Sequence, residues 1–208
     1  MAYLKLEDGR ALEEAIGVLQ HGGVIAFPTD TVYGIGASLE HPEALQRIYD
    51  LKGRAPDKPL PILISRPEVV DQLSPDVDER LIELAQHFWP GALTVVMPAA
   101  DHLPAEVRAP DNTIGVRLPN HSIPLSIAER AGGAIATTSA NISGQDAAHA
   151  AAEIQEAFGG AIDIVLDGGF SPETNASTVI RAVNGEIEVL REGAIDTAEI
   201  RKVWRELQ

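Results

Sequence analysis

The chain has 208 residues, 45% of them hydrophobic, so it is long enough to bury a core within one domain. It has no apolar run of the roughly 18 to 20 residues that span a membrane, no start typical of a signal peptide and no cysteine, which argues against membrane insertion, secretion, disulfides and thiolate chemistry. The formal charge of −15 disfavours non-specific binding to nucleic acid, because such binding depends on clustered Lys and Arg. We therefore expect a single domain over residues 1–208, a cytoplasmic location and no membrane association.

Short apolar, β-branched runs alternate with helical patterns along the chain, which is typical of an α/β layer architecture. The predicted strands are residues 24–27, 60–64, 93–97, 113–118, 134–138, 163–166, 177–183 and 186–190. The predicted helices are residues 10–20, 42–52, 66–72, 77–88, 123–131, 147–157 and 197–207. The Asn184-Gly185 pair between the last two strands predicts a hairpin, and the sheet is therefore mixed rather than purely parallel.

Several helices carry start signals. Pro42 suits a first helical position. Ser65, Asp76 and Asp196 each precede a Glu by three residues, which is the spacing of a capping box.

The segment PTDTVYGIG, residues 28–36, directly follows the first predicted strand. Its composition fits an ordinary polar turn. It also supplies the hydroxyls of Thr29, Thr31 and Tyr33, while Gly34 and Gly36 let the backbone approach a ligand. Both interpretations remain open on this segment alone.

Three cations, Lys52, Arg54 and Lys58, fall in the loop KGRAPDK after a predicted helix. A run of charges is usually a solvated surface. In so acidic a chain, three cations on one loop also suit a polyphosphate.

The segment TTSANISG, residues 137–144, follows another strand and contains Ser139 and Asn141. It fits either a Ser/Thr-rich turn with a helix cap or an anion-binding loop. Two further cations, Arg117 and Arg191, lie in or at the end of apolar strands, where an arginine can also serve only to keep a sheet edge soluble.

Familiar catalytic motifs are missing from the sequence. It contains no P-loop, no dinucleotide-binding fingerprint and no glycine-flanked serine elbow. The six histidines show no metal-ligand spacing, so we predict no protein-held metal.

Taken together, PTDTVYGIG, Lys52-Gly53-Arg54, FWPGALT at 88–94 and Ser139-Ala140-Asn141 resemble the YrdC-like threonylcarbamoyl-AMP synthase family in order and spacing, over residues 22–193. The resemblance implies a twisted open mixed sheet flanked by helices, around a large, positively lined cavity. It also implies an L-threonylcarbamoyladenylate synthase, a nucleotidyltransferase that uses L-threonine, bicarbonate and ATP, with Mg²⁺ bound mainly by the nucleotide. The product serves N6-threonylcarbamoyladenosine modification of tRNA, through a downstream transfer complex.

The resemblance assigns roles to individual residues, with Lys52 and Arg54 as the catalytic cations. The ATP-binding set is Lys52, Arg54, Lys58, Thr113, Ser139, Asn141 and Arg191. The threonine-binding set is Thr31, Arg117, Thr137 and Ser177. Weak or no direct binding of tRNA is expected from the net charge.

The chain departs from longer relatives at two of these places. Lys58 stands where they often have Asn, and Leu63 lies near the position of a His that helps to hold threonine. The chain is similar to the short, single-domain form of the family.

Two other functions of the same fold remain as alternatives. One is a non-catalytic nucleotide- or RNA-binding module of the YciO type. The other is a carbamoyl-adenylate-forming module of the kind found in hydrogenase maturation factors, which needs carbamoyl phosphate and partner domains.

Overall fold

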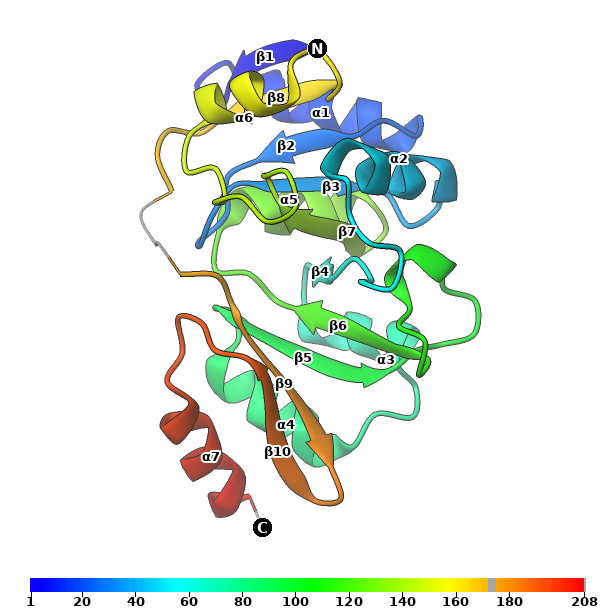
Figure 1. Ribbon diagram of the computed structural model, residues 1–208, viewed down its shortest axis with the longest axis vertical. Helices are drawn as coiled ribbons and strands as arrows, with labels where there is room; N and C mark the ends of the chain where they lie inside the picture. The colour runs from blue at the N-terminus through cyan, green and yellow to red at the C-terminus, as the bar shows by residue number, and fades with distance from the viewer. Residues whose placement is uncertain (172–174, 208) are drawn as a thin grey trace.

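The computed structural model describes residues 1–171 and 175–207, and it contains one ten-stranded mixed sheet within that part of the chain. The strands are β1 Ala2–Lys5, β2 Ile25–Phe27, β3 Gly34–Ala37, β4 Ile62–Ile64, β5 Leu93–Pro98, β6 Thr113–Arg117, β7 Ala134–Ser139, β8 Ile164–Asp167, β9 Thr178–Val183 and β10 Glu186–Arg191. Their order across the sheet is β1-β8-β2-β3-β7-β4-β6-β5-β9-β10 (Figure 1). The predicted α/β class and the open mixed sheet are confirmed.

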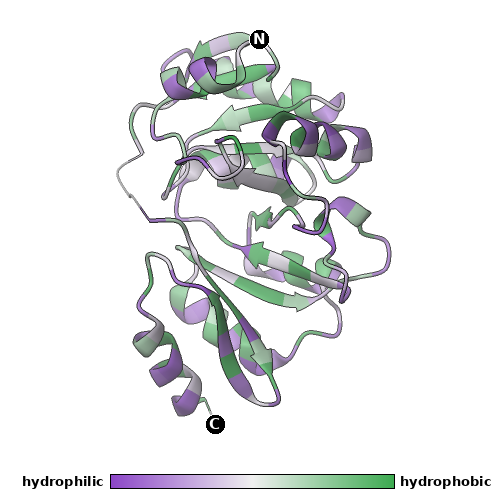
Figure 2. Cartoon of the chain, in the orientation of Figure 1, coloured by the Kyte–Doolittle hydropathy of each residue, from purple (hydrophilic) through white to green (hydrophobic). Residues whose placement is uncertain are grey.

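The α-helices are α1 Ala11–Gln20, α2 Pro42–Lys52, α3 Val70–Leu73, α4 Glu79–Phe88, α5 Ser122–Arg130, α6 Ala151–Phe158 and α7 Thr197–Glu206, with short 3-10 turns η1 Pro67–Val69 and η2 Ala105–Val107. α1 and α5 pack together and contact β8, β2, β4 and β7, whereas α2 and α6 contact β3, β2 and β8. α4 and α7 pack against each other beside β5 and β10. Hydrophobic residues predominate along many of the strands, whereas the helices carry hydrophilic and hydrophobic residues in alternation (Figure 2).

Sequence signals account for several helix and turn boundaries. Pro42 is the first residue of α2, and the Asp196 carboxylate accepts a hydrogen bond from the Ala198 amide at the start of α7. Asn184 and Gly185 have φ angles of 52° and 80°, as a type I′ hairpin turn requires.

Two of the expected caps are wrong. Asp78 rather than Asp76 caps α4, since its carboxylate accepts from the Arg80 amide. The Ser65 hydroxyl donates to Glu129 instead of capping the turn that follows it.

Two strands were not predicted. β1 is a largely exposed edge strand that pairs in parallel with β8, so it lacks the apolar run that identifies the inner strands. β3 comes from the glycine-rich end of PTDTVYGIG and pairs antiparallel with β2 and β7. A Cβ on Gly36 would lie 2.9 Å from the Ala136 carbonyl oxygen and one on Gly34 would lie 2.9 Å from Thr137 Cγ2, so close approach of neighbouring strands requires both glycines.

The loops that follow β2 and β7 are joined to the segment before α6 by backbone hydrogen bonds. The Tyr33 amide donates to the Ala148 carbonyl, the Ala148 amide to the Ala140 carbonyl and the Ala140 amide to the Tyr33 carbonyl. This triangle fixes two of the sequence motifs against each other at one end of the sheet.

No helix in the described residues is long and apolar enough to cross a membrane.

Candidate active site

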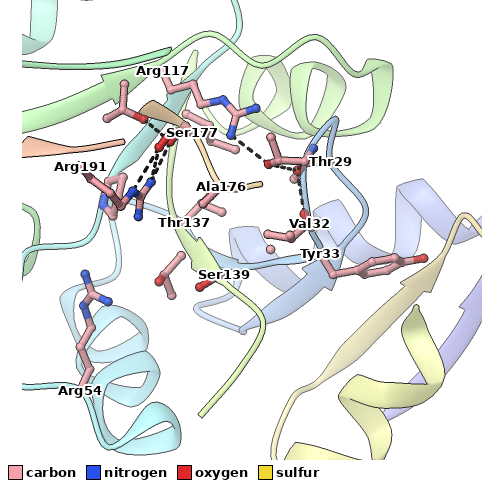
Figure 3. A pocket seen from close by; sticks show the side chains of 16 residues that line it. Thr29, Val32, Tyr33, Arg54, Arg117, Thr137, Ser139, Ala176, Ser177 and Arg191 are labelled. Atoms are coloured by element: carbon pink, nitrogen blue, oxygen red, sulfur yellow. Dashed lines mark hydrogen bonds between the residues drawn. The ribbon is translucent and has the colours of Figure 1, made fainter. Parts of the chain in front are cut away.

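A cavity of about 150 Å³ is lined by residues near the ends of β2, β6, β7 and β10 and near the starts of β3, β5 and β9. The lining residues are Thr29, Thr31, Val32, Tyr33, Gly34, Arg54, Pro61, Leu63, Thr94, Arg117, Thr137, Thr138, Ser139, Ala176, Ser177 and Arg191. Figure 3 shows Arg54, Arg117 and Arg191 around this space, with Thr137 and Ser139 between them.

Arg117 ends β6 and is fixed by three partners. Its Nε donates to the Gly91 carbonyl at 2.9 Å, Nη1 to the Thr31 hydroxyl at 3.1 Å and Nη2 to the Asp30 carboxylate at 2.6 Å. The ion pair is buried, with side chains 8% and 14% exposed for Arg117 and Asp30. Because a guanidinium has five N–H groups, this arrangement holds the Arg117 plane in place and still leaves donors for a ligand.

Ser177, just before β9, connects two other residues of the wall. Its hydroxyl lies 2.8 Å from that of Thr94 on β5, and Arg191 donates to both its hydroxyl and its carbonyl, at 3.0 and 2.8 Å. Thr94 is 4% exposed and lines the cavity. The sequence prediction did not include Thr94, although it ends the quoted motif FWPGALT; only its place in that motif could have indicated it.

Thr137 on β7 presents a buried hydroxyl in the cavity wall. It is 6% exposed, lines the cavity, and its Oγ1 has no hydrogen-bond partner among the described residues. A buried hydroxyl without a partner costs free energy, so its position at a cavity indicates that a polar ligand completes it.

The three guanidinium groups share one electrostatic environment. Burial lowers the pKa of Arg191, and the charges of Arg117 and Arg54 lower it further. Burial is also the main cause that lowers the pKa values of Arg54 and Arg117, with Asp30 opposing it at Arg117. Three positive charges therefore line one cavity of an otherwise acidic protein, and this cavity suits an anionic ligand.

The structure brings together all four residues of the expected threonine set, Thr31, Arg117, Thr137 and Ser177. Of the expected ATP set it brings three to the same cavity, namely Arg54, Ser139 and Arg191.

The other four residues of the ATP set do not line this cavity. Lys52 is 1% exposed and donates to the segment 139–141. The side-chain Nδ2 of Asn141 donates to the Gln145 carbonyl in the same loop. Lys58 is exposed, with its carbonyl accepting from Tyr49 and Arg54. The Thr113 hydroxyl donates to Asp111 at the far end of β6.

Leu63 and Pro61 form an apolar part of the wall, and Leu63 is 5% exposed. Leu63 pairs with Arg117 across β4 and β6. The cavity thus has a guanidinium group beside an apolar surface, which suits a small amphipathic ligand.

Residues 17–193 match the family model described as telomere recombination, which comprises Sua5, YciO and YrdC proteins. The chain belongs to the Sua5/YciO/YrdC family. It is 38% identical over 194 residues to a protein of Pyrococcus abyssi named threonylcarbamoyl-AMP synthase, covering 93% of this chain and 57% of that protein. It is 34% identical over 193 residues to the protein of that name from Bacillus subtilis, with 92% and 56% covered.

A solved family member has the same fold. The structure of P. abyssi Sua5 complexed with L-threonine superimposes with a TM-score of 0.90 and 35% identity, covering 98% of this chain and 61% of the other. This family member therefore confirms the resemblance to YrdC-like proteins. The chain spans a little over half the length of these relatives.

Proposed function

We propose that this chain is an L-threonylcarbamoyladenylate synthase, a nucleotidyltransferase that converts L-threonine, bicarbonate and ATP into threonylcarbamoyl-AMP and pyrophosphate. The observation that carries the proposal is the convergence on one small cavity of Arg117, which has donors to spare, and the unpartnered Thr137 hydroxyl. The names of the relatives and the L-threonine in the P. abyssi structure support the same function.

The size of the cavity favours the amino acid as its occupant. At about 150 Å³ it is smaller than the roughly 300 Å³ at which pockets for drug-sized ligands begin. We place the threonine carboxylate on Arg117 and the rest of threonine near Thr31, Thr137 and Ser177. ATP then lies across the mouth, where Arg54, Arg191 and Ser139 face it.

The reaction needs alignment and charge neutralisation rather than a protein nucleophile. The neutral amine of threonine attacks the carbon of bicarbonate, water leaves, and a carbamate forms. A carbamate oxygen then attacks the α-phosphorus of ATP, and pyrophosphate departs with the bonding electron pair. Arg54 and Arg191 supply positive charge where the phosphate oxygens gain negative charge, the usual contribution of such residues to phosphoryl chemistry.

The side chains that line the cavity indicate how Mg²⁺ would be held. The sixteen lining residues named above offer hydroxyls and guanidinium groups, and none of these sixteen carries a carboxylate. This set does not fit a protein-built Mg²⁺ cage, which uses carboxylates. We therefore propose that Mg²⁺ arrives bound to the phosphates of ATP.

The proposed product would serve threonylcarbamoyl transfer to tRNA by a downstream complex in the cytoplasm. The chain's own role ends with the activated intermediate, consistent with a surface of net charge −15 that does not favour tRNA. The YciO-type binding module and the carbamoyl-adenylate-forming module remain weaker alternatives, since the P. abyssi and B. subtilis relatives both carry the synthase name.

The test is chromatography of a reaction with purified protein, ATP, Mg²⁺, bicarbonate and L-threonine, with each small molecule omitted in turn. We expect threonylcarbamoyl-AMP and pyrophosphate only in the complete mixture. Binding of ATP without product would contradict the synthase and favour the binding module, and product only with carbamoyl phosphate would favour the third function.

A further inference from the structure

Lys52 is the last residue of α2, and its side chain is buried beneath the loop that follows β7. It is 1% exposed. Its Nζ donates to the Ser139 carbonyl, to the Asn141 carbonyl at 2.6 Å and to Asn141 Oδ1 at 3.1 Å. The three acceptors are neutral oxygens that belong to one three-residue segment.

These contacts use the whole donor capacity of the side chain. A lysine ammonium has three N–H groups and no acceptor. Because all three N–H groups have acceptors in the loop, Lys52 can bind a phosphate only by giving up one of these bonds. Arg54, two residues later, lines the cavity instead.

The loop depends on this ammonium for its internal order. Asn141 Oδ1 accepts from both Lys52 and the Ser139 hydroxyl, the latter at 2.6 Å, while its Nδ2 donates to the carbonyls of Ile142 and Gln145. The Ser143 amide closes the arrangement by donating to the Lys52 carbonyl at 2.9 Å. The Lys-x-Arg and Ser-x-Asn motifs are thus joined in one network at Lys52, Ser139 and Asn141.

We propose that Lys52 is a positioning residue, which holds the segment 139–143 from behind the cavity wall and does not contact the nucleotide. The proposal rests on the proposed function, because it concerns the residue that presents Ser139 to ATP. It replaces the direct phosphate contact that the sequence resemblance implies for Lys52. Arg54 remains the cation of this motif that faces the ligand.

The electrostatics agree with this placement. Burial, together with a smaller effect of the charge of Arg54, lowers the pKa of Lys52 from 10.5 to about 7. A triphosphate bound in contact with this ammonium would raise the pKa again, since an opposite charge favours the charged form.

The first experiment compares Lys52→Met with the matched variant Arg54→Met by amide hydrogen exchange of the ligand-free protein. We expect exchange in residues 139–145 to accelerate about tenfold or more in Lys52→Met and to stay unchanged in Arg54→Met, because only the former opens the loop. Equal protection of this segment in wild type and Lys52→Met would overturn the proposal. The result does not depend on catalysis, so it stands even if the protein makes no product.

A second measurement uses the wild-type protein and so avoids a variant that fails to fold. The pKa of Lys52 is followed by NMR of its side-chain Cε and Nζ, with and without saturating ATP and Mg²⁺. We expect it to change little when ATP binds. A rise of roughly 1 to 3, as a phosphate in contact would cause, would overturn the proposal; a wild-type protein that binds no ATP would count against the proposed function, with hydrogen exchange still deciding the role of Lys52.

Discussion

On one side of the cavity Thr94, Arg117 and Thr137 project from strands, whereas on the other side Arg54 projects from the turn after α2. The strand side is deeply buried and keeps donors available, as the unpartnered Thr137 hydroxyl illustrates. On the loop side, the Lys52 ammonium donates all its hydrogen bonds to the segment 139–141. Arg54 donates to the carbonyls of Lys58 and Pro59. The strand side therefore offers donors to a small ligand, whereas on the loop side the three N–H groups of Lys52 all have acceptors and Arg54 is the residue with donors to spare.

We expect the largest effect from the variant Arg117→Met, which removes the main cation of the strand side. Breaking a buried ion pair by removing one partner costs about 3 to 5 kcal/mol of unfolding free energy, because Asp30 is left buried and unpaired. We expect threonine-dependent release of pyrophosphate to be lost and the protein to unfold at lower denaturant concentration.

The double variant Arg117→Met with Asp30→Asn separates the two roles of Arg117. Removing the stranded charge should recover much of the lost stability but none of the activity. Recovered activity in the double variant would show that Arg117 acts only in folding, and the strand side would lose its proposed ligand.

Thr137→Val should weaken the binding of threonine without lowering the free energy of unfolding. The hydroxyl has no partner in the protein, so its removal should leave unfolding free energy unchanged or slightly higher. Threonine affinity should fall by about 1 to 3 kcal/mol, the cost of leaving a polar group of the ligand unpaired. Calorimetric titration and chemical denaturation measure the two quantities, and unchanged threonine affinity would mean that the cavity is completed by something else.

Thr94→Val should have a smaller effect, because it removes only the hydrogen bond to the Ser177 hydroxyl. We expect the KM for threonine to rise by a factor that corresponds to about 0.5 to 1.5 kcal/mol, and Thr94→Ser to restore it. The matched control is Thr178→Val, which removes a buried hydroxyl bonded to Ile195. If Thr178→Val changed the KM for threonine as much as Thr94→Val does, and Thr94→Ser failed to restore it, Thr94 would contribute only to packing.

The pH dependence of stability tests the loop side. Since the pKa of Lys52 is about 7 in the folded protein and ordinarily 10.5, the unfolded chain binds more protons between these values. Burial of Lys52 therefore costs stability in full below pH 7, and that cost declines as the pH rises towards 10.5. Denaturation of wild type and Lys52→Met across this range should show wild type gaining stability relative to the variant; a constant difference would mean that the pKa of Lys52 is not lowered.

Most of the inner strands and the helices could be predicted from the sequence, because the apolar residues that form their patterns are the ones buried in the folded protein. The missed strand β3 shows where such reasoning ends, since Gly34 and Gly36 carry no strand preference and are selected by close contact with β2 and β7. The four residues expected around threonine do meet, whereas the burial of Lys52 could not be inferred, because spacing along a loop does not indicate which cation faces inwards. Their binding roles stay predictions.

The order of strands has a consequence for how the cavity arises during synthesis. Its lining comes from segments between Thr29 and Arg191, and β9, which begins directly after Ser177, pairs with β5. Domains form as units while the chain emerges from its N-terminus. A nascent chain halted before Arg191 therefore lacks part of one wall of the cavity.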